Sequence, residues 1–337
     1  MKRFAVVVLA SLPAFFAAPA FSAETINGAG ATFPNPIYQK WFGEFKQAHP
    51  DVEINYQSLG SGAGIRQLTE GTVDFGASDA PMTDEQIKGL KAPALHFPTV
   101  MGAVVITYNV PGVTGSLKLT PDAVAGIFLG EIKKWDDPKI ASANPGVKLP
   151  SSSVEVVHRS DGSGTSFIFT DYLSKVSGEW KSKVGANTSV SWPVGLGGKG
   201  NEGVAGIIKQ TPGSIGYVEL IYAVQQKLPF ADVKNGAGKF VTPSFASVTA
   251  AASGMKEMPD DFRVSITNGP GAGAYPISSF TWLLIPTQIS DPAKKKALVD
   301  FLGWMLTTGQ KDCEGLSYAQ LPKAVIAKEQ KQIAKIK

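Results

Sequence analysis

The sequence contains a single cysteine, Cys313, among its 337 residues. One thiol permits no intramolecular disulfide, no CxxC redox motif and no thiolate metal cluster. Histidine is also scarce: His49, His96 and His158 are far apart and lack the spacing of metal ligands. We therefore expect neither a disulfide framework nor a metal site, so any function must rest on other side chains.

A strong excess of charge and a second long apolar run are absent as well. The net charge of +4 falls to +2 without Lys2 and Arg3, and no basic run alternates with aromatic residues, which argues against nucleic acid. Residues 1–23 read MKRFAVVVLASLPAFFAAPAFSA, with two basic residues, an apolar core interrupted by proline, and small residues at the end. This pattern predicts a cleaved secretory signal peptide rather than a spanning helix.

Two cleavage sites remain open. Cleavage after Ala20 best satisfies the small-x-small rule, and cleavage after Ala23 is the alternative, with residue 24 taken as the start of the mature chain. About 310 residues then remain, which suggests two domains. No cysteine lies near either site to carry a lipid, so we expect a soluble protein in an extracytoplasmic compartment.

Strand-like and helix-like segments alternate along the mature chain, which predicts an α/β fold with mainly parallel sheets. Two long apolar segments, 97–109 and 276–286, predict strands that pass from one domain to another. They bracket a middle segment of domain size. We therefore expect two lobes joined by two hinge crossings, with a ligand cleft between them: lobe I from residues 24–101 and 275–337, and lobe II from residues 102–274.

Three glycine-rich loops each join a predicted strand to a predicted helix. They read GAGATFP (28–34), GSGAG (60–64) and DGSGTS (161–166), and their hydroxyls belong to Thr32, Ser61, Ser163 and Thr165. A helix start offers free backbone N–H groups and the positive end of the helix dipole, both of which favour an anion. Three such loops favour an oxyanion held between the lobes. Alternatively, each hydroxyl only caps a helix and each glycine only forms a turn.

Two charged residues accompany these loops. Arg159 supplies a positive charge and a bidentate geometry suited to an oxyanion, and Asp161 would orient it. The alternative for Arg159 is an ordinary surface position. Asp79 follows a predicted strand. It would either cap the next turn or, in an anion site, accept a hydrogen bond from a protonated oxygen of the ligand.

The sequence resembles the periplasmic phosphate-binding proteins of bacterial high-affinity phosphate ABC transporters. The resemblance rests on the segments GAGATFPNPIYQKW, VDFGASDAPMTDE, IFLGEIKKWDDPKI, HRSDGSGTSFIFTDYL, WPVGLGGKGNEGVAG and GSIGYVE. It covers nearly the whole mature chain and is thin at residues 231–262. It implies a two-lobed α/β fold of the type II periplasmic binding-protein class.

The resemblance also implies a function. The protein would capture inorganic phosphate in the periplasm and deliver it to an inner-membrane permease and its ATPase, as a monomer, with no chemistry of its own and no cofactor. The implied phosphate-binding residues are Thr32, Phe33, Ser61, Asp79, Arg159, Ser163, Gly164 and Thr165, with Asp161 as the partner of the arginine.

Three other interpretations fit parts of the sequence. A binding protein for another oxyanion, such as sulfate or arsenate, is the nearest. A phosphoester hydrolase would use Ser163 as nucleophile and His158 as base, but the chain lacks a GxSxG elbow. GLGGKG (195–200) matches a dinucleotide fingerprint, but Pro193 spoils the strand that should precede it. We interpret that loop as structural or close to the hinge.

Overall fold

The computed structural model of the protein describes residues 23–337. Apart from Ala23, the predicted signal peptide lies outside the described residues. Within residues 23–337, no helix combines the length and the apolar character needed to cross a membrane.

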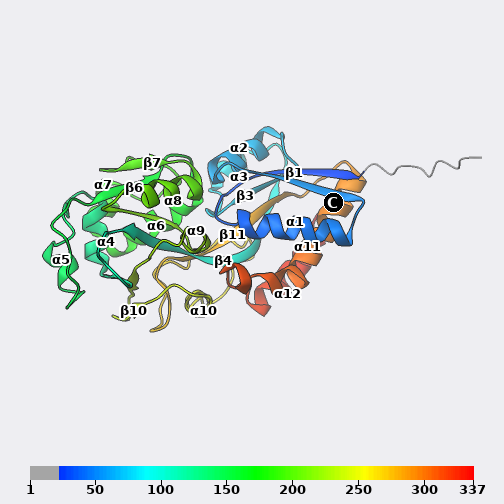
Figure 1. Ribbon diagram of the computed structural model, residues 1–337. Helices are drawn as coiled ribbons and strands as arrows, with labels where there is room; N and C mark the ends of the chain where they lie inside the picture. Colours follow the sequence, from blue (N-terminus) through cyan, green and yellow to red (C-terminus); the bar gives the residue numbers. More distant parts are fainter. Residues whose placement is uncertain (1–22) are drawn as a thin grey trace, which may run out of the picture.

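Helices and strands alternate as expected, and Figure 1 shows them gathered in two lobes. The strands are β1 (Glu24–Gly30), β2 (Val52–Ser58), β3 (Phe75–Ser78), β4 (Ala94–Asn109), β5 (Lys118–Leu119), β6 (Glu155–Arg159), β7 (Leu196–Gly198), β8 (Ser214–Glu219), β9 (Asp232–Lys234), β10 (Phe240–Val241) and β11 (Ser278–Pro286). The helices are α1 (Asn35–Ala48), α2 (Ser61–Glu70), α3 (Asp84–Lys88), α4 (Pro121–Phe128), α5 (Pro138–Ala141), α6 (Gly164–Val176), α7 (Gly178–Lys183), α8 (Gly200–Gln210), α9 (Leu220–Gln226), α10 (Phe245–Ser253), α11 (Pro292–Thr307) and α12 (Lys323–Ile333), with short 3₁₀ turns at Gly309–Asp312 and Glu314–Leu316.

Helix ends follow the capping signals in the sequence. Thr83 and Gln86 form a capping box at α3, in which the Thr83 hydroxyl accepts from the Gln86 N–H and the Gln86 side chain accepts from the Thr83 N–H. At α4, the Thr120 hydroxyl accepts from the Ala123 N–H at 3.2 Å, and Pro121 occupies the first turn. Each cap satisfies N–H groups that a helix start leaves without partners.

One sheet of eight strands, in the order β2-β1-β3-β11-β4-β8-β6-β7, connects the two lobes. It is parallel at both ends, where β1 pairs with β2 and β3, and β6 pairs with β7 and β8. It is antiparallel in the middle, where β11 pairs with β3 and β4, and β4 pairs with β8. The predicted mainly parallel sheet is therefore wrong for the centre, because the chain crosses between the lobes in opposite directions along β4 and β11.

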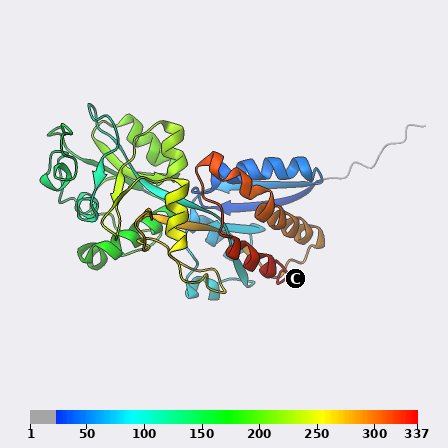
Figure 2. The same ribbon diagram turned by 90° about the horizontal axis from the view of Figure 1, so that it is seen from below.

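Strand β4 is the long connection between the lobes. Its residues Ala94–Ala103 pair with β11, and Val104–Asn109 pair with β8. Nearly all of the strand is buried, as its continuous apolar sequence predicts. Figure 2 shows the blue and the orange-to-red segments together in lobe I and the green and yellow segments in lobe II, so both ends of the described chain belong to one lobe.

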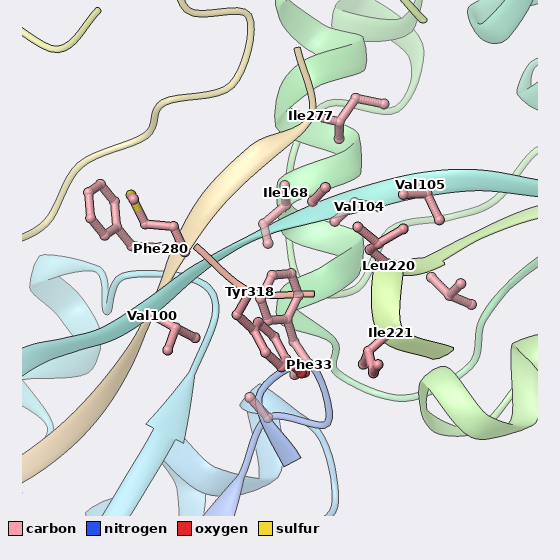
Figure 3. Close-up of a cluster of buried hydrophobic side chains, with 14 of the residues drawn as sticks. Phe33, Val100, Val104, Val105, Ile168, Leu220, Ile221, Ile277, Phe280 and Tyr318 are labelled. Atoms are coloured by element: carbon pink, nitrogen blue, oxygen red, sulfur yellow. The ribbon is translucent and has the colours of Figure 1, made fainter. Parts of the chain in front are cut away.

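An apolar cluster packs around the paired strands β4 and β11, where the chain passes between the lobes (Figure 3). Phe33 and Tyr318 lie side by side in it, with ring centroids 6.2 Å apart, and the Tyr318 hydroxyl donates to the Phe33 carbonyl at 2.6 Å. A side chain at Gly102 of β4 would place its Cβ 2.5 Å from the Phe33 ring, so glycine is required there. This packing fixes the loop that follows β1.

The segment with the weakest sequence signal, residues 231–262, forms short elements that depend on tertiary contacts. β9 pairs with β10 and β5 in a small separate sheet. Beyond it, Lys328 of α12 donates to the Met258 carbonyl at 2.7 Å, and Lys175 of α6 donates to the Thr267 hydroxyl at 2.7 Å. Strands of two or three residues carry too little periodicity to be predicted from sequence.

Candidate anion-binding site

Three of the predicted segments meet at the hydroxyl of Ser61. This residue begins α2 in lobe I, and its oxygen accepts from the Gly164 N–H at 3.0 Å and from the Asp79 N–H at 3.1 Å. Gly164 begins α6 in lobe II, and Asp79 directly follows β3. A Cβ on Gly164 would lie 2.4 Å from the Ser61 oxygen, so only glycine permits this approach.

Arg159, at the end of β6, is 2% exposed, so its alternative as a surface residue is wrong. Its guanidinium donates to both carboxylate oxygens of Asp161, from Nε at 2.8 Å and from Nη2 at 2.5 Å. Its Nη1 donates to the Thr165 hydroxyl at 3.1 Å. The bidentate pair fixes the orientation of the arginine and offsets part of its charge.

The pKa of Asp161 lies below its ordinary value. Burial alone would raise the pKa, but the hydrogen bonds and charge of Arg159 and the Gly200 N–H, which donates at 3.0 Å, together outweigh burial. Asp161 is therefore an ionised carboxylate whose oxygens are already engaged.

Asp79 behaves in the opposite way. It is 1% exposed, and burial raises its pKa to about 7, against the opposing effects of Thr281, Arg159 and Ser61. One carboxyl oxygen accepts from the Thr281 hydroxyl at 2.8 Å. At neutral pH this carboxyl therefore gains or loses a proton easily.

The remaining predicted residues lie beside this group. The Ser163 hydroxyl accepts from the Ser166 N–H at 3.0 Å, so Ser163 is the N-cap of α6, as the alternative interpretation of the loop proposed. Thr32 and Phe33 are buried in the loop after β1, and the Thr32 carbonyl accepts from the Tyr222 hydroxyl at 2.5 Å. The structure thus gathers all eight predicted ligand residues and Asp161 in one buried region, while their contacts with phosphate stay a prediction.

Two polar residues at this site were missed by the sequence analysis. Asn201, fully buried in the first turn of α8, donates from its amide to the Thr32 hydroxyl at 2.8 Å and to the Thr165 hydroxyl at 3.1 Å. Thr281 is one of three hydroxyl residues in β11, together with Ser278 and Ser279, so nothing in the sequence singled it out. Asn201 follows the GLGGKG loop. That loop, interpreted as structural or close to the hinge, lies against the site residues, since its Gly200 N–H donates to Asp161.

The two lobes touch outside the buried group. The Gly62 N–H of lobe I donates to the Gly162 carbonyl of lobe II at 2.8 Å. A cavity of about 520 Å³ opens beside this contact and is lined by Arg66 and Lys199, among others, and by one side of Asp161. The buried residues therefore lie on the inner side of this contact between the lobes, and the cavity lies on its outer side.

The contacts required by the hydrolase alternative are not found here. The Ser163 oxygen is engaged as a helix cap, and His158 pairs its Nδ1 with the Arg159 carbonyl at 2.9 Å. The His158 ring stacks on Trp192 at 4.8 Å. No hydrogen bond joins Ser163 and His158, both of which the structure describes. Across residues 23–337, no group of three or more His, Cys, Asp or Glu side chains gathers to hold a metal ion.

Two lobes, two crossing strands and a buried set of donors at helix starts define a solute-binding protein of the type II periplasmic class. The family described as the PBP superfamily domain matches residues 17–308. The chain is 48% identical over 299 residues to the phosphate-binding protein PstS of Xylella fastidiosa (strain Temecula1), which covers 88% of this chain and 81% of that protein. It is 46% identical over 312 residues to PstS of Pasteurella multocida, with coverage of 92% and 90%.

This chain therefore belongs to the PstS family of phosphate-binding proteins within the PBP superfamily. A high-affinity periplasmic phosphate-binding protein solved with bound phosphate has a TM-score of 0.73 and 20% identity, over 91% of this chain and 93% of that one. That likeness supports the fold. The family resemblance and the fold class expected from the sequence are both confirmed.

Proposed function

We propose that this protein binds inorganic phosphate in the periplasm and presents it to the permease of an ABC-type phosphate importer. The observation that carries the proposal is a buried arginine with converging N–H and hydroxyl groups beside one carboxyl of near-neutral pKa. Phosphate at neutral pH is an anion that retains a proton, so it needs many donors and one acceptor. The names of the relatives, phosphate-binding protein PstS, support the same ligand.

Each predicted residue has a role in this proposal. The hydroxyls and the backbone N–H groups donate to phosphate oxygens, Arg159 adds a charge-assisted donor, and Asp79 accepts from the P–OH group. The donating residues are Thr32, Phe33, Ser61, Ser163, Gly164 and Thr165, and the Gly164 N–H would turn from the Ser61 hydroxyl, to which it donates here, to the anion. Asp161 contacts Arg159 rather than the ligand and holds the guanidinium in place.

The proposed lobes are residues 24–101 with 275–337, and residues 102–274. The change of partner along β4, between Ala103 and Val104, supports this division. The predicted ligand side chains are at most 2% exposed and Gly164 is buried, so phosphate would enter only when the lobes separate and the bond between Gly62 and Gly162 breaks. Rotation about β4 and β11 would open and close the site.

We further propose that the protein is a monomeric binding protein rather than an enzyme, without a cofactor, exported by a signal peptide at residues 1–23. Its partners would be the permease and ATPase of the importer. The names of the relatives as binding proteins and the absence of a Ser163 to His158 hydrogen bond support a role in binding alone.

Calorimetric titration with phosphate, sulfate and arsenate tests the proposal. Because co-purified phosphate would hide the site, the protein is first unfolded, dialysed and refolded. We expect a Kd for phosphate at or below about 1 μM, or about 8 kcal/mol of binding free energy. Millimolar phosphate binding, or tighter binding of sulfate, would overturn the assignment. Turnover of a chromogenic phosphate ester in the same preparation would instead favour the hydrolase alternative.

A further inference from the structure

We propose that Asn201 is a positioning residue that forces the hydroxyls of Thr32 and Thr165 to act as hydrogen-bond donors to the bound anion. The inference rests on the proposed function, since the anion is the phosphate of that proposal. It gives the glycine-rich loop before α8 a role in the site.

The orientation of the Asn201 amide is fixed by its surroundings. The Glu219 N–H lies 3.0 Å from the Asn201 side-chain oxygen. A backbone N–H can only donate, so the amide oxygen must face Glu219, and the amide nitrogen must face the opposite way. The nitrogen therefore points at the two threonines.

The two amide hydrogens of Asn201 are both used. One is donated to the Thr32 hydroxyl at 2.8 Å and the other to the Thr165 hydroxyl at 3.1 Å. Thr32 follows β1 in lobe I, whereas Thr165 lies in α6 of lobe II. One fully buried side chain therefore joins a predicted phosphate residue of each lobe.

Each threonine oxygen also receives a second donor. The Asn201 N–H donates to Thr32 at 3.3 Å, and Arg159 Nη1 donates to Thr165 at 3.1 Å. A hydroxyl oxygen has two lone pairs and one hydrogen. With both lone pairs engaged by N–H groups, each hydroxyl has only its hydrogen left to offer.

This arrangement removes an ambiguity that hydroxyls usually bring to a binding site. A free hydroxyl rotates to accept or donate, so it would accommodate either a protonated or an ionised oxygen of the ligand. Thr32 and Thr165, held as donors, accept no ligand proton. Asp79 then accepts the hydrogen bond from the P–OH group of phosphate. This carboxyl can therefore distinguish phosphate from an anion that carries no proton. Asn201 thus acts on selectivity through two residues that contact the anion.

The start of α8, where the glycine-rich loop ends, serves both sets of groups. Its Gly200 N–H donates to Asp161, which holds Arg159, and the next residue, Asn201, holds the two threonines. A one-residue shift of the loop would therefore disturb the arginine and the hydroxyls together.

The first test compares Asn201→Ala with Asn144→Ala in phosphate titrations. Asn144 is a matched control, since it is also a buried asparagine and bonds Lys118 and Ile140 far from the site. Without Asn201 the two threonines no longer hold their hydroxyl hydrogens toward the charged anion, and a hydrogen bond to a charged group contributes about 1.5–3 kcal/mol, so we expect Asn201→Ala to weaken phosphate binding by about 10- to 150-fold. Asn144→Ala should lower the melting temperature without changing the phosphate affinity by more than about twofold. An equal affinity for Asn201→Ala and wild type would overturn the proposal.

The second test separates aiming of the hydroxyls from general support of the fold. In a Thr32→Val and Thr165→Val background there is no hydroxyl to aim, so adding Asn201→Ala should change the phosphate affinity by less than about threefold. A purely structural asparagine would cost the same in both backgrounds, and that additive result would contradict the proposal. Asn201→Leu, which leaves a smaller cavity, serves in the same cycle if the alanine variant does not fold.

The wild-type protein in these titrations keeps the two proposals apart. If wild type does not bind phosphate, the proposed function fails and takes this inference with it. If wild type binds tightly and the losses are additive, only the role of Asn201 is overturned.

Discussion

Asp79 and Asp161 lie on opposite walls of one buried site, and their surroundings shift their pKa values in opposite directions. On the lobe II wall, Asp161 receives two hydrogen bonds from Arg159 and one from Gly200, and its pKa is lowered. On the lobe I wall, Asp79 is buried with a hydroxyl donor from Thr281, and its pKa is raised to about 7.

The difference indicates that the two walls of the site have different roles in binding. A carboxylate paired with an arginine is satisfied before any ligand arrives, so Asp161 serves to orient positive charge. A carboxyl without a cationic partner in direct contact is costly to ionise when buried, unless a ligand supplies a proton for it. We therefore assign attraction of the anion to the lobe II wall and its selection to the lobe I wall.

The largest effect should come from Asp79→Asn. Sulfate carries no proton, so at pH values well above the Asp79 pKa of about 7 the ionised carboxylate faces only sulfate lone pairs, and sites that pair a ligand hydroxyl reject its absence by up to about 10⁴-fold. An amide supplies a donor, so the phosphate-to-sulfate affinity ratio should fall by up to about 10⁴-fold, mainly because sulfate is admitted. Calorimetry with both anions measures it.

Asp161→Asn is the comparison for that variant. Because Asp161 acts through Arg159, its substitution should weaken phosphate and sulfate by similar factors and leave their ratio nearly unchanged. If Asp79→Asn also left the ratio unchanged, the carboxyl would be only a turn cap and the division between the walls would fail.

Removal of the positive charge should have the next largest effect. Loss of a charged partner to a buried anion typically costs about 2–5 kcal/mol, so Arg159→Ala should weaken phosphate binding by roughly 30- to 5,000-fold. Arg66→Ala is the control, since Arg66 lies in the outer cavity and is exposed. Its effect should be small and should shrink further as salt is added. Similar losses for both arginines would contradict the prediction.

The pair of Arg159 and Asp161 allows a rescue experiment. In Arg159→Ala the Asp161 carboxylate stays near the anion without its partner. We therefore expect Arg159→Ala with Asp161→Ala to bind phosphate more tightly than Arg159→Ala alone. A further loss in the double variant would show that the two residues do not act as a pair.

The smallest predicted effect is a pH dependence carried by Asp79. A sulfate complex needs the protonated carboxyl, and above the pKa of about 7 that proton must be taken up from solution. Sulfate affinity should thus fall about tenfold for each pH unit above about 7. Phosphate keeps a proton of its own, so its affinity should stay nearly constant over the same range. The slope for sulfate should vanish in Asp79→Asn, and a slope that persists there would assign the titration to another group.

Much of the fold could be predicted from local patterns. The three strand-to-helix loops, the capping box at α3 and the long strand β4 agree with the apolar spacing and turn residues of their segments. The antiparallel centre of the sheet could not be predicted in this way, because strand direction depends on how the chain passes between the lobes. The short elements after residue 231 carry too few residues for a periodic signal.

The candidate site, like the fold, could be predicted only in part from the sequence. The sequence by itself determined which donors and charges the loops supply, because glycine, serine and threonine at a helix start act through their own backbone neighbourhood. The tertiary structure alone decided that Arg159 is buried, that Asp79 has a raised pKa and that Asn201 joins Thr32 to Thr165. Asn201 and Thr32 are 169 positions apart, and burial and hydrogen bonding between such distant segments exist only once the lobes pack together.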